Sequence, residues 1–561
     1  MNRRAFLAGS LASTGLAACG RPPAAPVAPL GTAASAGLAA RGHRWQAPFV
    51  AGGELQRADV VIVGAGVAGL SAAWRLAGQG LSVRLLELWS APGGTAVSGT
   101  GPRGAYPWGA HYLTLPGPDA LHVRRLLRDV GVITGADAEG RPTYSSDALC
   151  LAPEERIWDG GRWIDGLWPE AHAEPEDRRQ RDAWSALVAE WSARVGADGL
   201  PAFTIPVAKS SKDPAIRALA DRSFASFLDE LGFTAPVMRW SLEYATRDDF
   251  GASLTDCSAW AGLHYFCSRR PDPGDARDLG THVLTWPAGN GWLVDHLVTR
   301  AGVPVETGVV VRQVEVEDGR VRVWADVPGA DGTARTLGIE AGSVVLAVPA
   351  RLARRLLGAP PVGTPVGTPV VTDGPLDLAG FRALPDAALP DHAPWRVAQL
   401  QVSRLPSAHG VPTAWDSVVY GAASLGYVTA THQGGNYGGP SVLSWYQPVL
   451  GDPLAGRRAL LDEPWEAARD LVLDDLGPSH PDLLDVLERL DVWHWGHGTV
   501  VPAPGLHRVG RLDALAALHP RVHLAHTDLS GVSLFEEASF HGIRAAEAVL
   551  ALHGRPGATW L

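Results

Sequence analysis

A glycine-rich segment, residues 64–69, has the residue types and the spacing to bind the phosphates of a dinucleotide. Gly64 permits a tight turn, Gly66 lets the backbone approach a pyrophosphate, and Gly69 lets a helix pack closely on a strand. Phosphates would lie at the N-terminus of the following helix, where backbone N–H groups and the helix dipole favour anions. Glu87 lies 18 residues beyond Gly69, where its carboxylate can accept hydrogen bonds from both ribose hydroxyls.

The elements that must position these residues are also visible in the sequence. Residues 59–63 form a β-branched run that predicts a buried strand, and a helical stretch follows the glycines through Leu76. A second strand is expected over residues 81–88 and carries Glu87. The order of strand, glycine turn, helix, strand and acid is that of a Rossmann βαβ unit.

Length and composition exclude several classes of protein. The chain has 561 residues, of which 46% are hydrophobic and 19% are charged, so two or three domains with large cores are expected. The formal net charge of −11 argues against nucleic acid as a partner. Four cysteines without a Cys-x-x-Cys pair exclude a disulfide scaffold and zinc knuckles. The only lysines are Lys209 and Lys212, which leaves few candidates for a catalytic amine.

The N-terminal residues have the pattern of a targeting signal. Arg3 and Arg4 precede an apolar run over residues 5–18, which is too short to span a bilayer. The pattern resembles a twin-arginine export signal over residues 1–19, and its end resembles a lipobox in which Cys19 receives the lipid. Residues 20–56 read as a linker. We expect an exported, periplasmic or extracytoplasmic protein with a lipid anchor as its only membrane contact; an ordinary secretory signal with a chance cysteine is the alternative.

Two further segments distinguish FAD from NAD. Pro92-Gly93-Gly94-Thr95 follows Glu87 closely, and Gly109-Ala110-His111 lies further along the chain. Together with the Rossmann unit, these segments resemble the FAD-dependent oxidoreductases of the flavin amine oxidase and phytoene desaturase superfamily. The resemblance implies FAD as the cofactor, with Gly93, Gly94 and Thr95 under its phosphates and with Gly109, Ala110 and His111 beside the isoalloxazine.

Later segments follow the order of the same superfamily. Residues 286–293 resemble its entry to a helix, and residues 309–323 alternate around Asp318-Gly319 as in a hairpin. The resemblance implies that the backbone of Val311 clasps the adenine. Residues 522–528 read as a strand followed by Asp528, which by the same resemblance contacts the ribityl chain or the pyrophosphate.

The last helix is expected over residues 533–552, and the resemblance directs its N-terminus at the flavin. Ser533 and Glu536 have the spacing of a capping box, which favours a structural role for Glu536. Glu537 lies about 100° further round the helix and is a candidate to face the flavin. His111 and Glu537 are therefore the candidate catalytic residues.

The matches predict an α/β fold class, with a Rossmann-like FAD-binding domain and a discontinuous α+β substrate domain. The FAD-binding domain would comprise residues 57–115, 285–350 and 505–553. The substrate domain would comprise residues 116–284 and 351–504. Its first part has helical patterns over residues 183–195 and 223–231, and its second part has strand patterns over residues 395–402, 417–420, 426–431 and 442–446.

Three other patterns could suggest a second nucleotide site, a metal site and a disulfide. Residues 434–439 are glycine-rich, but they lie between two expected strands, so a hairpin loop is favoured over a second dinucleotide site. His494 and His497 have a metal-like spacing without a nearby carboxylate in a ligand pattern, so no metal is expected. Whether Cys257 and Cys267 form a disulfide stays open.

We expect an exported FAD-dependent oxidoreductase that removes a hydride from a small organic substrate, with dioxygen or an electron-acceptor partner as the oxidant. Flavin amine oxidases usually hold a lysine near the flavin, and the region expected for it, residues 370–420, has none. The substrate is therefore not predicted. The alternatives are a desaturase or isomerase of an apolar substrate, and a membrane-anchored flavoprotein that assists a partner without catalysis.

Overall fold

The computed structural model describes residues 49, 51–52, 55–272, 282–317, 319–329, 334–358, 376–435, 438–506 and 512–561. The expected export signal, Cys19 and nearly all of the expected linker lie outside these residues. None of the helices in the described ranges is both long enough and apolar enough to cross a membrane.

The first sheet contains the predicted Rossmann unit. Strand β1 (Leu55–Val63), helix α2 (Val67–Leu76) and strand β2 (Val83–Leu86) follow one another, and β1 pairs in parallel with both β2 and β14 (Ala334–Leu346). The strand order is β11-β2-β1-β14-β13-β12, and β20 pairs with the end of β14. The remaining strands are β11 (Val305–Glu306), β12 (Val310–Glu317), β13 (Arg320–Pro328) and β20 (Val522–Leu524).

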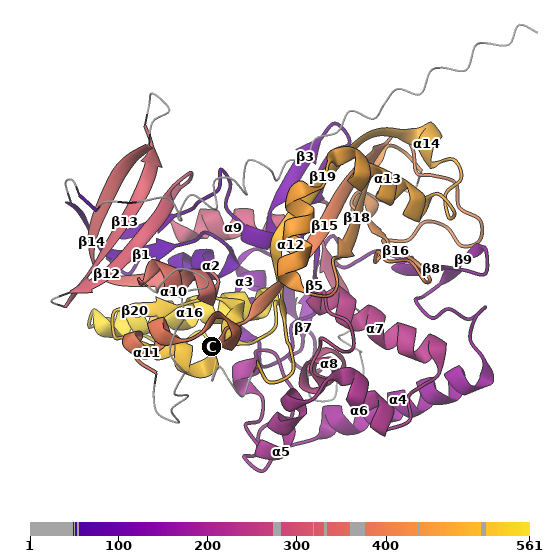
Figure 1. Cartoon of the computed structure of the whole chain (residues 1–561), viewed down its shortest axis with the longest axis horizontal. Helices are drawn as coiled ribbons and strands as arrows, with labels where there is room; N and C mark the ends of the chain where they lie inside the picture. Colours follow the sequence, from indigo (N-terminus) through magenta and orange to yellow (C-terminus); the bar gives the residue numbers. More distant parts are fainter. Residues whose placement is uncertain are drawn as a thin grey trace, which may run out of the picture.

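The alternation of side chains along β1 explains why the sheet is covered on both faces. Val60 and Ile62 belong to one hydrophobic cluster, whereas Val61 and Val63 belong to another. Helix α2 packs on the first face together with α9 (Gly291–Ala301) and α16 (Phe535–Leu552). The opposite cluster includes Leu356 of α10 (Ala350–Leu356). Figure 1 shows this layered arrangement around α2, with the hairpin of β12 and β13 extending away from it.

The second sheet lies at the other side of the molecule (Figure 1) and has the order β19-β15-β18-β17-β16-β8-β9. All four strands expected in residues 395–446 are confirmed. The strands are β8 (Glu155–Asp159), β9 (Arg162–Asp165), β15 (Asp391–Val402), β16 (Asp416–Val419), β17 (Tyr427–Thr429), β18 (Ser441–Pro448) and β19 (Leu487–Val501). Since β17 and β18 pair antiparallel, the glycine-rich segment between them connects a hairpin, as predicted.

A group of helices packs beside the second sheet. Both helices expected in the first substrate segment are confirmed, and Ser223 caps α6 by accepting a hydrogen bond from the Ser226 N–H. The helices of this group are α4 (Pro175–Ala193), α6 (Phe224–Glu230), α7 (Pro236–Phe250) and α8 (Ala259–Cys267). The thiols of Cys257 and Cys267 are free, and each donates to a backbone carbonyl, so the structure has no disulfide between them.

The described residues form further strands and α-helices outside the two large sheets. They are β3 (Ser98–Gly101), β4 (Gly104–Pro107), β5 (Tyr112–Thr114), β6 (Ile133–Ala136), β7 (Pro142–Tyr144), β10 (Val283–Thr285), α3 (Leu121–Asp129), α5 (Pro214–Arg217), α11 (Leu378–Ala383), α12 (Pro453–Asp462), α13 (Trp465–Leu476) and α14 (Leu483–Val486). The two large sheets and their helices confirm the predicted fold class, since the Rossmann-like sheet draws its strands from three separate parts of the chain.

Candidate functional site

The first glycine turn is shaped so that no larger residue fits two of its positions. Gly64 has φ +97°, and a Cβ atom there would lie 2.5 Å from the Ala347 carbonyl oxygen. A Cβ atom on Gly69 would lie 1.9 Å from the Gly64 carbonyl oxygen. Gly66 is the N-cap of α2, where no side chain caps the helix and no acidic residue occupies the first turn. This terminus is thus suited to an anionic group.

The second glycine turn faces the first. Gly93 and Gly94 have φ values of +126° and +57°, and the backbones of Gly66 and Gly93 form a β-bridge. A Cβ atom on Gly94 would lie 3.4 Å from the Gly66 Cα atom. The two turns, separated in the sequence, therefore form a cradle lined by backbone. A backbone-lined cradle at a helix N-terminus offers N–H groups, which suits the phosphates of a dinucleotide.

Glu87 stands at the end of β2, beside the glycine cradle. Its Oε2 atom accepts a hydrogen bond of 2.7 Å from the Ala65 N–H, and its Oε1 atom accepts one of 2.8 Å from the Trp89 N–H. Burial raises the pKa of Glu87, and the two N–H groups oppose that rise. Each carboxylate oxygen keeps a lone pair for a further donor, so the geometry fits a ribose.

A cavity opens between the second sheet, the residues around Gly109 to Thr114, and the start of α16. Thr95, Gly109, Ala110 and His111 line one side. The Ala110 N–H donates to the Thr95 carbonyl oxygen over 2.9 Å, and a Cβ atom on Gly109 would lie 2.2 Å from that oxygen. The structure thus brings these four predicted residues together. Val311 is buried on β12 and is not among the residues that line this cavity.

Aromatic and acidic residues occupy different parts of the cavity wall. The second sheet supplies the apolar part, with Trp395, Val397, Tyr446 and Trp495. The acidic part comes from two helices, α7 and α16, and consists of Asp248, Asp249 and Glu536. Arg269 lies among these acids, with its Nη2 atom 3.7 Å from an oxygen of Asp249. An apolar body and a small polar group on one ligand would match this wall.

His111 presents a neutral imidazole to the cavity. Its Nδ1 atom lies 3.1 Å from the Gly109 carbonyl oxygen, and because a carbonyl only accepts, Nδ1 carries the proton. The Nε2 atom therefore holds a lone pair. Burial lowers the pKa of His111 to about 4, which keeps the ring neutral at neutral pH. The ring lies 5.0 Å from that of Tyr446, measured between centroids.

The structure corrects the expected roles of the two glutamates at the start of α16. The helix begins at Phe535 with Leu534 as its N-cap, and the Ser533 hydroxyl accepts a hydrogen bond from the Val500 N–H instead. The predicted capping box is therefore wrong. Glu536 lines the cavity with only 4% of its surface exposed, and its carboxyl makes no hydrogen bond with another side chain of the described ranges.

Glu537, the candidate catalytic residue, is fully buried and does not line the cavity. Its carboxyl accepts a hydrogen bond of 2.7 Å from the Val207 N–H and another from the Ser530 hydroxyl. The one-residue difference on the helix turns Glu537 away from the cavity and Glu536 toward it. Glu537 is therefore hydrogen-bonded within the protein, whereas Glu536 is the one of the two that lines the cavity.

The pH dependence of stability should report the burial of Glu537. Burial raises its pKa from 4.5 to about 7, so the folded protein holds a proton that the unfolded chain releases between these values. The contribution of Glu537 to the free energy of unfolding is therefore complete below pH 4.5. It falls as the pH rises to 7, by about 3 kcal/mol at most. Glu537→Gln should gain in free energy of unfolding relative to wild type between pH 4.5 and pH 8, in urea titrations. A constant difference would contradict the assignment.

Two further acids of the cavity wall, Asp248 and Asp249 on α7, were not predicted from the sequence. The Tyr112 hydroxyl lies 3.4 Å from an oxygen of Asp248, and burial raises the pKa of Asp248 to about 7. Burial likewise raises the pKa of Glu536 to about 7. A signal was present: Asp248 and Asp249 occupy the last turn of a helix, where the helix dipole disfavours negative charge. Acids in that position suggest a role other than helix stability.

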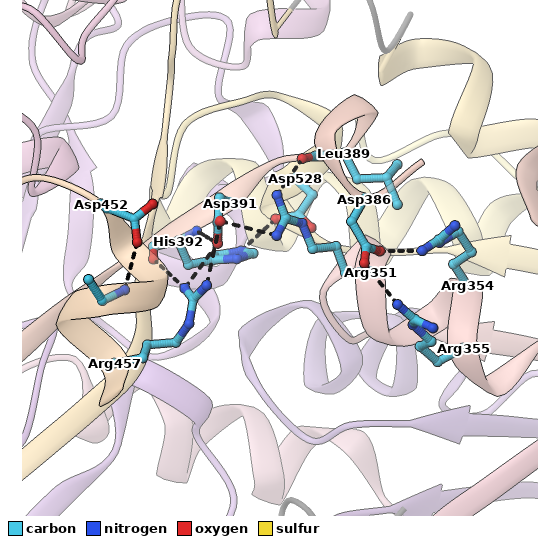
Figure 2. Close-up of polar contacts among 11 residues, drawn as sticks. Arg351, Arg354, Arg355, Asp386, Leu389, Asp391, His392, Asp452, Arg457 and Asp528 are labelled. Carbon is cyan, nitrogen blue, oxygen red and sulfur yellow. Dashed lines mark hydrogen bonds and ion pairs between the residues drawn. The ribbon is translucent and has the colours of Figure 1, made fainter. Parts of the chain in front are cut away.

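Asp528 is fully buried and does not line the cavity. Its carboxylate accepts hydrogen bonds of 2.7 Å from the Ala350 N–H and 2.8 Å from His392. One of its oxygens also lies 2.9 Å from the His526 Nδ1 atom, which accepts a hydrogen bond from the Asp528 N–H. Burial opposes its charge, but the two imidazoles outweigh burial and hold the pKa of Asp528 well below its usual range. Figure 2 shows that the contact with His392 joins the end of the first sheet to β15 of the second.

The same junction contains an ion-pair network (Figure 2). Asp391 pairs with Arg351 over 3.1 Å and with Arg457 over 3.0 Å. The ligand atoms of Asp391, His392 and His497 lie within 4.8 Å of one another, a spacing that a metal ion could use. Two guanidinium groups on Asp391 oppose a further cation there, because like charges repel at this range. The expectation of no metal stays a prediction.

Comparisons with known proteins agree with this architecture. Residues 62–130 match the family model for the NAD(P)-binding Rossmann-like domain. No curated protein matches the sequence of the chain. Cyclohexylamine oxidase from Brevibacterium oxydans IH-35A is similar in structure, with a TM-score of 0.60, 18% identity, and coverage of 89% of this chain and 100% of that one. A putrescine oxidase variant has a TM-score of 0.62, 16% identity, and the same coverage of both chains. A fatty acid isomerase from P. acnes has a TM-score of 0.57, 17% identity, and coverage of 86% of this chain and 97% of that one. At these identities the chain shares their fold.

Proposed function

We propose that this protein is an FAD-dependent oxidoreductase that removes a hydride from a small organic substrate. One observation carries the proposal: the glycine cradle with Glu87, and the segment Thr95 to His111, lead into one large cavity whose far wall belongs to a second sheet. A dinucleotide held at the cradle would extend toward the cavity, where a substrate has room. The similar structures include two oxidases, which supports the reaction class.

FAD fits the residues present. Gly64, Gly66, Gly93 and Gly94 would hold its phosphates, and Glu87 would hold its ribose. FAD held there would supply the acceptor for the hydride, with dioxygen or a partner acceptor as the final oxidant. Val311 stays the candidate contact for the adenine. Asp528, whose oxygens already accept two hydrogen bonds and lie close to His526, would act on the cofactor chiefly by holding the loop that precedes α16.

The protein itself would handle the proton. Removing a hydride from a carbon next to an O–H or N–H group leaves one proton to be accepted. Glu536 faces the cavity with a pKa raised by burial to about 7, a value that suits a general base. His111 has a lone pair on Nε2 but a lowered pKa, so it fits a wall that accepts a hydrogen bond from the substrate. The aromatic wall would orient the substrate and exclude water.

The direct test is anaerobic reduction of the purified, flavin-loaded protein with a panel of alcohols, amines and unsaturated acids. Bleaching of the flavin absorbance by one class, without any partner protein, supports the proposal. Bleaching only after addition of a protein partner would favour the reading as a flavoprotein that assists a partner.

A desaturase or isomerase is the second candidate, favoured by the structural similarity to the fatty acid isomerase and by the mostly apolar cavity wall. An isomerase returns its hydride to the product, so the flavin would show no net bleaching while the double bond moves. Chromatography of unsaturated fatty acids incubated with the protein separates this outcome from net oxidation.

The FAD should be tightly bound without a covalent link. The described C-terminal segments, 512–561, hold no cysteine that could bond the flavin. Acid precipitation should release the yellow colour into the supernatant, and colour left in the pellet would contradict this. Glu87→Ala should weaken FAD binding by roughly 1.5–3 kcal/mol, because charge-assisted ribose contacts are lost. Glu87→Gln, which keeps one carbonyl acceptor, should lose less in the same equilibrium dialysis.

The protein should be exported and lipid-anchored, with no nucleic acid partner. Replacing both Arg3 and Arg4 by lysine should keep the protein in the cytoplasm, because a twin-arginine signal depends on the arginine pair. Cys19→Ser should release the exported protein from the membrane fraction, because serine lacks the thiol through which the lipid anchor is attached. Fractionation with immunoblotting measures both, and normal export of the lysine variant or membrane retention of the serine variant would refute the corresponding part.

A further inference from the structure

Four tryptophans form a continuous contact chain between the cavity and the outer part of the protein. Trp495 and Trp493 have ring centroids 5.3 Å apart, and Trp493 lies 4.9 Å from Trp89. Trp108 lies 5.3 Å from Trp493 as a side branch. Such spacing places neighbouring rings in van der Waals contact. The chain crosses between β19, which carries Trp493 and Trp495, and the loop after β2, which carries Trp89.

The two ends of this tryptophan chain have different surroundings. Trp495 lines the cavity, where its indole N–H donates to the Trp108 carbonyl oxygen over 2.6 Å. Trp493 is 4% exposed, which places it in the interior. Trp89 is partly exposed and lies two residues beyond Glu87. The chain therefore connects the cavity wall with the solvent through one buried ring.

The indole N–H groups give the tryptophan chain a direction. An indole that loses an electron becomes a strong N–H acid, and it is trapped as a neutral radical where a base can take the proton. The Trp493 N–H is buried without a hydrogen-bond partner among the described residues, and the Trp495 N–H meets only a carbonyl, which is not a base. Neither ring can be trapped in this way. Trp89, in contact with solvent, can lose its proton to water.

We propose that Trp495, Trp493 and Trp89 form a route that carries oxidising equivalents out of the cavity and thereby protects the site. The proposal rests on the proposed function, because flavin and dioxygen are the source of one-electron oxidants of the peroxyl radical class in the cavity. Trp495 gives such a radical one electron, and a proton from water completes its reduction to a hydroperoxide. Trp493 then gives one electron to oxidised Trp495, and Trp89 gives one electron to oxidised Trp493.

Trp89 then loses its indole proton to water, and an external one-electron reductant of the ascorbate or thiol class returns one electron and one proton to it. The balance is one electron and one proton from the reductant for each radical reduced in the cavity. The cofactor and the side chains that face the substrate are protected from oxidation, because the radical that persists is on Trp89, the outermost ring.

Light provides the test, because blue light excites bound flavin but not tryptophan, and excited flavin is a one-electron oxidant inside the cavity. After a blue laser flash on the anaerobic, flavin-loaded protein, time-resolved absorption should show a long-lived tryptophan radical whose decay is accelerated by ascorbate. Trp493→Phe should lose the long-lived radical and its response to ascorbate. In this variant the oxidised ring is Trp495, next to the flavin, and the reduced flavin returns an electron to it rapidly. Trp89→Phe, a change at a partly exposed ring, should have the same effect without disturbing the core.

Trp395→Phe is the matched control. Trp395 lines the same cavity and pairs with Trp495 across β15 and β19, but its indole donates to Thr499, and in the described structure no ring contact joins it to Trp493 or Trp89. The Trp395→Phe variant should keep the long-lived radical. An unchanged radical lifetime in both Trp493→Phe and Trp89→Phe overturns the route alone, while the flavin colour upholds the cofactor assignment. A protein purified without flavin overturns the cofactor assignment and the route together.

Discussion

Replacing Gly66 by alanine is expected to weaken FAD binding roughly tenfold to a hundredfold while leaving the free energy of unfolding close to that of the wild type. Gly66 has φ −72° and ψ −177°, which alanine adopts without strain. The nearest protein atom to an added Cβ would be the Gly94 Cα, at 3.8 Å. The methyl group would therefore project into the cradle between the two glycine turns, where it would collide with the phosphates and not with the protein.

Gly69→Ala should behave differently although it lies in the same turn. Its Cβ atom would lie 1.9 Å from the Gly64 carbonyl oxygen, a backbone atom that cannot move away without opening the contact between α2 and β1. We expect a loss of about 3 kcal/mol or more of unfolding free energy along with the loss of FAD. Gly434→Ala, at a position with no atom within 4 Å, is the control.

Two measurements separate these variants: urea denaturation of the FAD-free protein, and isothermal titration with FAD. If Gly66→Ala bound FAD as the wild type does, the glycine cradle would not be the phosphate site. If it instead lost stability like Gly69→Ala, the effect on FAD would say nothing about the cradle, so the contrast between the two variants is the informative result.

Glu536→Gln should slow the reduction of bound flavin by roughly 100-fold or more, with full FAD content. The carboxyl faces the cavity, and glutamine has nearly the same shape but accepts no proton. Stopped-flow absorbance with a substrate that bleaches the wild type measures the rate. Because the base is active only when ionised, the wild-type rate should rise with pH through about 7, the raised pKa of Glu536, and the variant should lose that rise.

Glu537→Gln is the matched control for this experiment. The two residues are adjacent on one helix, both are buried, and burial raises both pKa values to about 7, so they differ mainly in whether they face the cavity. Glu537→Gln should reduce its flavin at nearly the wild-type rate. A slow Glu537 variant combined with a fast Glu536 variant would reverse the assignment made from the structure and restore the one made from the sequence.

Local patterns in the sequence were enough for most of the first sheet. The glycine turn, the acid at the end of β2, and the hairpin of β12 and β13 depend on neighbours within a few residues, and all of them were predicted. The capping box failed for a reason that lies elsewhere in the chain. The hydroxyl of Ser533 is taken by the N–H of Val500, 33 residues away, so the helix starts two residues later than its sequence suggests.

The sequence by itself determined the dinucleotide-binding unit, because strand, turn and helix follow from backbone sterics and from the period of the apolar residues. Only the tertiary structure decided which acids meet a ligand. Asp248 enters the cavity from α7, Glu536 faces it and Glu537 does not, and Asp528 turns to His392, 136 residues distant. These outcomes depend on how α7, α16 and the second sheet pack around the cavity, and burial there raises the pKa values of Asp248 and Glu536.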